Sequence, residues 1–130
     1  MLDRFNSVVG ELARPETTIV LLTTEFSFAP EPKRAPSDWP EVVWWRSVEV
    51  EDSFWHVYAA EVKWQAQRFD DVVRRVAADA TGNVMMCHPA CEWVVHPYDG
   101  GTDVILASTE SRNLLRERFI GWLSSRSDGL

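Results

Sequence analysis

The sequence has few cysteines, no long apolar run and little positive charge, and each shortage excludes a class of protein. Two cysteines in 130 residues cannot build the disulfide framework that holds small secreted domains together. No apolar run approaches the roughly 18 residues that a membrane-spanning helix needs, and the first residues lack the basic start and apolar core of a secretion signal. We therefore expect a soluble cytoplasmic protein with no membrane partner.

The small number of basic side chains argues against one class of binding partner. With 20 acidic and 13 basic side chains, the formal net charge is -7. A field of this sign repels the phosphates of a polyanion, so we expect no nucleic acid partner. Apolar residues make up 45% of the chain, a share typical of globular proteins, and the length suits one domain. Residues 1–130 are therefore predicted to fold as a single domain.

The first part of the chain is predicted to form a helix, a strand and a loop. Apolar residues recur at helical spacing over residues 3–13, and Pro15 ends this pattern because the residue before a proline is pushed out of the helical region. The apolar and β-branched residues 17–26 predict an inner strand. Residues 29–40 contain four of the seven prolines and are predicted to form an exposed loop.

A hairpin is predicted next. Residues 42–50 and 54–64 are rich in aromatic and β-branched side chains, and the polar residues 51–53 separate them. This pattern predicts two antiparallel strands joined by a turn. The even-numbered residues of the second strand, which include His56, are mostly apolar, so their shared face is expected to point toward the core.

The second half of the chain is predicted to contain a helix, three strands and a final helix. Apolar spacing predicts a helix over about residues 67–80, with Gly82 as its stop. Three strands and a last helix follow, at residues 84–87, 92–98, 103–107 and about 108–123. The last helix is expected to bury one apolar stripe, which consists of Leu115, Phe119, Trp122 and Leu123. The order α-β-β-β-α-β-β-β-α, with prominent hairpins, predicts an α+β fold in which helices pack on a mainly antiparallel sheet.

The most distinctive stretch is HPYDGGTD, which begins at His96 and lies between two apolar runs. Asp-Gly in this setting is a strong hairpin signal, and we expect at least one glycine of the turn to have a positive φ. A loop at residues 99–100 places His96 opposite Asp103, whereas a loop at residues 100–101 places Tyr98 opposite Asp103. Both registers are compatible with the sequence.

A carboxylate that orients an imidazole is found in many hydrolases and metal sites. This pairing defines a candidate polar site that consists of His56, His96, Tyr98, Asp99 and Asp103. The structural alternative is a well-formed turn that carries a surface His–Asp pair, and we favour this alternative.

The same stretch carries a family resemblance. Residues 96–105 (HPYDGGTDVI), 122–124 (WLS) and 129–130 (GL) resemble a family of bacterial proteins known as a domain of unknown function, and residues 45–46 and 83–85 are similar as well. The resemblance covers most of residues 42–130 and leaves the first 40 residues outside the pattern. It supports the domain prediction and implies no activity.

Cys87, His88 and Cys91, with His96 nearby, are residue types that zinc prefers. Structural zinc usually takes two ligand pairs, and a second cysteine pair is missing, so we expect no bound metal and two thiols that pack as apolar groups. The sequence also lacks a G-x-S-x-G elbow, an H-E-x-x-H helix, a phosphate-binding glycine loop and a dinucleotide fingerprint. We therefore expect no cofactor, and a binding protein fits the sequence better than an enzyme.

Tryptophan is abundant, with seven in the chain. Consecutive Trp44 and Trp45 must point to opposite faces of a strand, so either both faces are covered or one indole is exposed. Aromatic side chains concentrate at protein interfaces. With the acidic turn of the hairpin and the proline-rich loop, they define a candidate interface that consists of Trp39, Trp44, Glu49, Glu51 and Asp52.

Two hypotheses of function follow. The first is a small acidic protein-interaction module that binds a basic protein partner, with an immunity or antitoxin-like inhibitor as its concrete form. The second is a hydrolase or small-ligand-binding protein with a site around His96, Tyr98, Asp99 and Asp103. The second hypothesis requires these side chains to converge in a concave pocket, whereas the first leaves them scattered around a turn.

Overall fold

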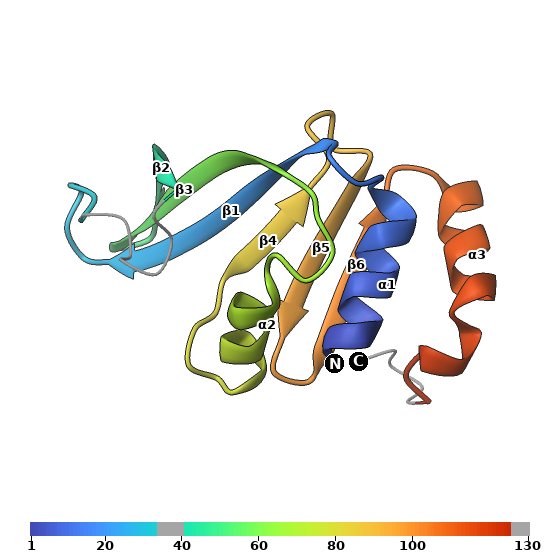
Figure 1. The fold of residues 1–130 in the computed structure, drawn as a ribbon. Helices are drawn as coiled ribbons and strands as arrows, with labels where there is room; N and C mark the ends of the chain where they lie inside the picture. Colours follow the sequence, from blue (N-terminus) through green and yellow to red (C-terminus); the bar gives the residue numbers. More distant parts are fainter. Residues whose placement is uncertain (34–40, 126–130) are drawn as a thin grey trace.

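Six strands form one antiparallel sheet in the computed structural model, which describes residues 1–33 and 41–125. The elements in chain order are α1 (Leu2–Leu12), β1 (Thr18–Ser27), β2 (Val43–Val50), β3 (Ser53–Lys63), α2 (Asp70–Ala77), β4 (Val84–Cys87), β5 (Trp93–Tyr98), β6 (Gly101–Leu106), α3 (Thr109–Arg118) and a short 3₁₀ helix (Ile120–Trp122). The strand order β2-β3-β1-β4-β5-β6 makes β2 and β6 the two edges. Helices α1 and α2 lie against one part of the sheet, and α3 stands beyond β6 (Figure 1).

The α+β class and the order of the three helices and six strands are confirmed. The inner position of β1 is also confirmed, because β3 and β4 pair with its two sides. In the described part of the chain, no helix has both the length and the apolar content to cross a membrane.

Helix α2 is shorter than the predicted segment 67–80. Gln67 and Asp79 have φ values of 70° and 53°, a left-handed conformation that cannot continue an α-helix. These residues limit the helix to Asp70–Ala77. The expectation that Gly82 ends this helix is therefore wrong, because the chain has left the helical conformation before it.

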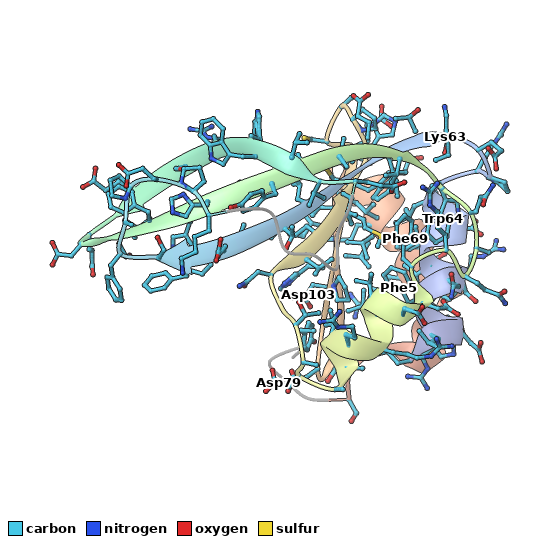
Figure 2. All side chains as sticks on the ribbon, turned by 60° about the vertical axis from the view of Figure 1, so that its left-hand side comes forward. Phe5, Lys63, Trp64, Phe69, Asp79 and Asp103 are labelled. Carbon is cyan, nitrogen blue, oxygen red and sulfur yellow. The ribbon has the colours of Figure 1, made fainter. Side chains whose placement is uncertain are left out.

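The core lies between one face of the sheet and helices α1 and α2. In β5 the odd-numbered residues are buried and the even-numbered ones are half-buried, which is the alternation of a strand with one face on a core. Helix α1 contributes Phe5 and helix α2 contributes Val73 to the same buried cluster. Figure 2 shows Phe5, Trp64 and Phe69 gathered where the sheet meets the helices, and the rings of Trp64 and Phe69 stack with centroids 6.1 Å apart.

The predicted buried stripe of the last helix is wrong. No residue of α3 is buried: Leu115 is half-buried, and so is Phe119 just after the helix. Trp122 and Leu123 are 40% and 47% exposed. Helix α3 lies beside the edge strand β6 rather than over the sheet, so its apolar side has no sheet face to cover (Figure 1).

One hydrogen bond caps α3, and one ion pair connects it to α1. At its start, the Oγ of Ser108 accepts a hydrogen bond from the backbone N–H of Ser111 at 3.1 Å, which caps the helix. Near its end, Arg118 forms an ion pair with Glu11 of α1, with 3.0 Å between Nη2 and Oε2.

Beyond residue 23 of β1, the sheet continues as a three-stranded extension that we call the arm, residues 24–27 and 43–57. Strand β4 pairs with β1 only from Val20 to Thr23, so the arm consists of β1, β2 and β3 alone. It projects past the helices (Figure 1).

Both tryptophans of strand β2 are exposed on the arm. Trp44 is 51% exposed and Trp45 is 58% exposed, so the possibility that both strand faces are covered is wrong. The register shifts between Trp44 and Arg46, which makes Trp45 the extra residue of a bulge. In the proline-rich segment, residues 29–33 are exposed, while residues 34–40, with Trp39, lie outside the described residues.

Candidate functional site

The hairpin between β5 and β6 has the first of the two registers allowed by the sequence. His96 lies opposite Asp103 and Tyr98 lies opposite Gly101, which leaves residues 99–100 as the loop. His96 contacts Tyr98 through rings whose centroids are 6.3 Å apart. In the described part of the chain, no hydrogen bond or ion pair joins His96 to Asp103, although they are cross-strand partners.

The glycines of this turn serve a purpose other than the one expected from the sequence. Neither Gly100 nor Gly101 has a φ in the left-handed region, so the expectation of a positive φ is wrong. The ring of Tyr98 instead folds over the turn. A Cβ at Gly101 would lie 3.0 Å from the Tyr98 hydroxyl, and one at Gly100 would lie 3.1 Å from its Cε2. A Cβ at either glycine would therefore press on the Tyr98 ring, which would have to shift by a few tenths of an ångström.

This contact gives a testable coupling between Gly101 and Tyr98. We expect Gly101→Ala to be less favourable in the wild-type chain than in a Tyr98→Ala background, by about 1 kcal/mol of unfolding free energy, because only the wild type has a ring to displace. The comparison removes the entropic gain that Gly→Ala brings to the unfolded chain in both backgrounds. Urea unfolding of the four proteins measures the coupling, and additive effects would contradict the contact.

A groove of about 720 Å³ lies between α1, β6 and α3. Its main polar and aromatic lining residues are Arg4, Tyr98, Asp103, Arg112, Arg116, Phe119 and Trp122. Tyr98 and Asp103 of the candidate polar site line this groove, whereas His96 and Asp99 do not. His56 lies on β3, separated from β5 by β1 and β4. The structure therefore brings only two of the five predicted site residues together in a concave surface.

The arginines of the groove were not among the site residues predicted from the sequence. Arg112 and Arg116 are four residues apart on α3, and Leu115 and Phe119 alternate with them at helical spacing. All four line the groove. This spacing could have indicated from the sequence that the four side chains act together, because residues three and four apart share one side of a helix. Arg4 comes from the other wall, with its Cζ 5.6 Å from the centre of the Trp122 ring.

His56 belongs to a separate buried network on the arm. The indole N–H of Trp44 donates to Ser47 Oγ at 3.1 Å, and Ser47 Oγ lies 2.6 Å from His56 Nδ1. Because an indole can only donate, the Ser47 hydroxyl is free to donate to Nδ1, which then accepts. Nε2 therefore carries the hydrogen, and it lies 3.0 Å from Ser27 Oγ and 3.1 Å from the Ala29 carbonyl oxygen.

This network satisfies both ring nitrogens of a side chain that is fully buried. A serine beside an imidazole also resembles a nucleophile and its base. Neither Ser47 nor His56 lines the groove, however. The network therefore acts as an internal tie between β2, β3 and the segment that follows β1.

The two cysteines singled out by the sequence lie outside the groove. Cys87 is buried and Cys91 is exposed. Burial, and to a lesser extent the nearby Cys91, raises the pKa of the Cys87 thiol, which keeps it protonated and unreactive near neutral pH. Among the described residues, no three histidine, cysteine or acidic side chains are placed to hold a metal ion.

Comparison with known protein families decides the affiliation of the chain. The model of the domain of unknown function DUF3885 matches residues 1–127. The chain belongs to this family. Comparison with the curated proteins and with the solved structures finds no significant match.

The extent of the match corrects one expectation from the sequence. The first 40 residues lie inside the DUF3885 domain, although they were expected to lie outside the family pattern. Helix α1 with Arg4 and strand β1 are therefore parts of the family unit. Both walls of the groove, α1 and α3, belong to the DUF3885 domain.

Proposed function

We propose that this DUF3885 domain is a protein-binding module that presents its arm to a basic partner protein, as an immunity or antitoxin-like inhibitor would. The observation that supports the proposal is a set of exposed apolar side chains on the arm and directly after β1. We call this set the arm surface; it consists of Phe26, Phe28, Val43, Trp44, Trp45, Val48 and Val50. Trp44 lies opposite Tyr58 and Val48 lies opposite Trp55, so these side chains occupy both faces of the arm, and a partner must contact the arm on both faces to cover them all. Apolar side chains exposed in this number mark interaction sites, because a monomer gains nothing by exposing them to water.

Aromatic rings at the centre of the arm surface contact one another. Phe26 packs edge-on against Phe28 at 5.2 Å and against Trp55 at 5.6 Å, and Val48 pairs with Trp55 across the strands. Phe28 is nevertheless 78% exposed. Rings that are already held in place lose little side-chain entropy when a partner covers them, which is a property of binding hot spots.

The charge of the arm favours a basic partner. Glu49, Glu51 and Asp52 lie at the turn of the hairpin, and all three are exposed. The chain as a whole carries a net charge of -7. A basic surface approaching this turn is attracted by both, so its association rate should fall as salt screens the field.

The experiment places a photo-crosslinking amino acid at Val48 of the arm, with Leu114 on α3 as the matched exposed control. We expect the Val48 probe to capture a protein of high isoelectric point and the Leu114 probe not to capture it. With that partner purified, Trp44→Ala and Phe28→Ala should each raise the Kd by about 30-fold, as at a hot spot worth roughly 2 kcal/mol.

Two outcomes would contradict the proposal. One is equal capture of the same protein from Leu114 and Val48. The other is an unchanged Kd for Trp44→Ala and Phe28→Ala when their circular dichroism matches that of the wild type. An association rate that does not change with salt would remove the electrostatic part of the argument.

A further inference from the structure

We propose that the groove between α1, β6 and α3 binds a small organic anion that carries a flat aromatic group. The proposal is independent of the protein partner, because the arm ends at edge strand β2 whereas the groove borders edge strand β6, at the opposite edge of the sheet. A second, smaller hollow between α1 and α2 is lined by Arg74 but by no aromatic ring.

The size and composition of the groove suit a small ligand. Its volume of about 720 Å³ falls in the range of ligand pockets. Leu115, Phe119, Trp122 and Leu123, which a buried helix would press into the core, line the groove instead and stay at least partly exposed. An apolar stripe that no protein element covers leaves apolar surface for a ligand to bury.

The charge of the groove opposes that of the chain. Arg4, Arg112 and Arg116 line it, and in the described part of the chain none of them forms an ion pair with a carboxylate. Arg112 donates only to the amide oxygen of its neighbour Asn113, at 3.2 and 3.3 Å. Like charges four residues apart destabilise a helix, and a bound anion would remove this repulsion.

Asp103 carries the single carboxylate among the lining residues, all of which the structure describes. Its one negative charge stands against the three positive charges of Arg4, Arg112 and Arg116, so the lining side chains keep an excess of positive charge. The positive charge of the three arginines is therefore not fully neutralised within the groove.

The aromatic wall stands beside these cations. The rings of Phe119 and Trp122 stack at 4.8 Å with an interplanar angle of 22°, and Arg4 lies over Trp122. A planar ring can pack against this wall while its acidic group reaches the guanidinium groups of Arg112 and Arg116, which bind carboxylates and phosphates through paired hydrogen bonds. The shared chemistry is an aromatic acid, and the acid can be a carboxylate or a phosphate ester.

The test measures binding of two matched probe pairs to the full chain by titration calorimetry. Benzoate is compared with its neutral analogue benzamide, and phenyl phosphate with inorganic phosphate. We expect one or both aromatic anions to bind at least about tenfold more tightly than benzamide and inorganic phosphate. Benzamide lacks the negative charge that the arginines bind, and inorganic phosphate lacks the aromatic ring. Whether benzoate or phenyl phosphate binds more tightly distinguishes the carboxylate from the phosphate ester.

Variants assign the site to the groove. Arg112→Gln and Arg116→Gln in one protein should weaken binding of the aromatic anion by at least about tenfold, whereas Arg14→Gln, an equal charge change per site outside the groove, should change it less than about twofold. Trp122 should also report binding through a shift of its indole N–H signal in the NMR spectrum.

The proposal is overturned if neither aromatic anion binds more tightly than both benzamide and inorganic phosphate, or if Arg14→Gln weakens binding as much as the double variant does. Circular dichroism of the double variant checks its fold. Should that variant be unfolded, Arg4→Gln, whose side chain lies on the other wall, replaces it with the same expected loss.

Discussion

Trp64→Ala is expected to lower the free energy of unfolding by about 3–5 kcal/mol, the largest effect of any single substitution considered for this domain. Trp64 follows β3, is only 1% exposed and stacks on Phe69 just before α2. Its backbone is also fixed, because its N–H donates to the carbonyl of Thr17 and its carbonyl accepts from the N–H of Glu16. The surrounding chain therefore cannot collapse into the space left by the indole.

Urea unfolding followed by circular dichroism measures this loss. Trp45→Ala is the matched control, since it makes the same chemical change at an exposed position of the bulge. We expect the control to change the unfolding free energy by less than about 1 kcal/mol. Similar losses for the two substitutions would mean that Trp64 is not the core residue that the structure describes.

His56→Ala is expected to destabilise the domain by about 2–4 kcal/mol, because it removes a fully buried ring and leaves the Ser47 hydroxyl without its acceptor. Ser27 keeps its hydrogen bonds with Ala29. His56→Leu separates the two causes, because leucine refills most of the volume without restoring the hydrogen bonds. We expect His56→Leu to recover only part of the loss. The free energies of both variants come from denaturant unfolding.

His96→Ala serves as the control for this second prediction. His96 is half-buried and forms no hydrogen bond with its cross-strand partner Asp103 in the described part of the chain. We expect it to cost less than about 1 kcal/mol. If His96→Ala were as destabilising as His56→Ala, or if His56→Leu were as stable as the wild type, the hydrogen-bonded network on the arm would not contribute as we describe.

The same network links stability to the proposed binding function. Trp44, an expected anchor for a partner, donates its indole N–H to Ser47, which is bonded to His56. Loss of His56 should therefore loosen the indole of Trp44 and weaken partner binding, although no side chain of the arm surface is removed. This link distinguishes a prepared binding surface from apolar side chains that are exposed by chance.

Local sequence patterns determined the secondary structure of this protein. The alternation of apolar residues and the helical spacing at the start of the chain depend on near neighbours, and both were confirmed. A polar turn after β2 was confirmed as well, but it consists of residues 51–52, because Ser53 belongs to β3 and pairs with Val50. The loop at residues 99–100 is one of two registers that the sequence allowed. Choosing between them required the pairing of β5 with β6, which two glycines in a row do not specify because both offer the same freedom to a turn.

Boundaries and exposure were decided by the tertiary structure. Helix α2 is shorter than its apolar pattern because Gln67 and Asp79 adopt left-handed conformations that no helical periodicity predicts. Helix α3 has the apolar spacing of a buried helix, yet it lies beside an edge strand and turns that side toward a groove. Periodicity states which residues share a side of a helix, but only packing states what that side faces.

The two candidate sites, the arm surface and the groove, also differ in how far the sequence alone could identify them. Trp44 was identified from the sequence because two adjacent tryptophans on one strand cannot both face one core, and this argument needs only strand geometry. The groove could not be identified in this way. Arg4 and Arg116 are far apart in the chain, and they line one groove only because α1 and α3 flank the same edge of the sheet. Long-range contacts of this kind are set by the summed packing of the whole chain, to which no short stretch of sequence corresponds.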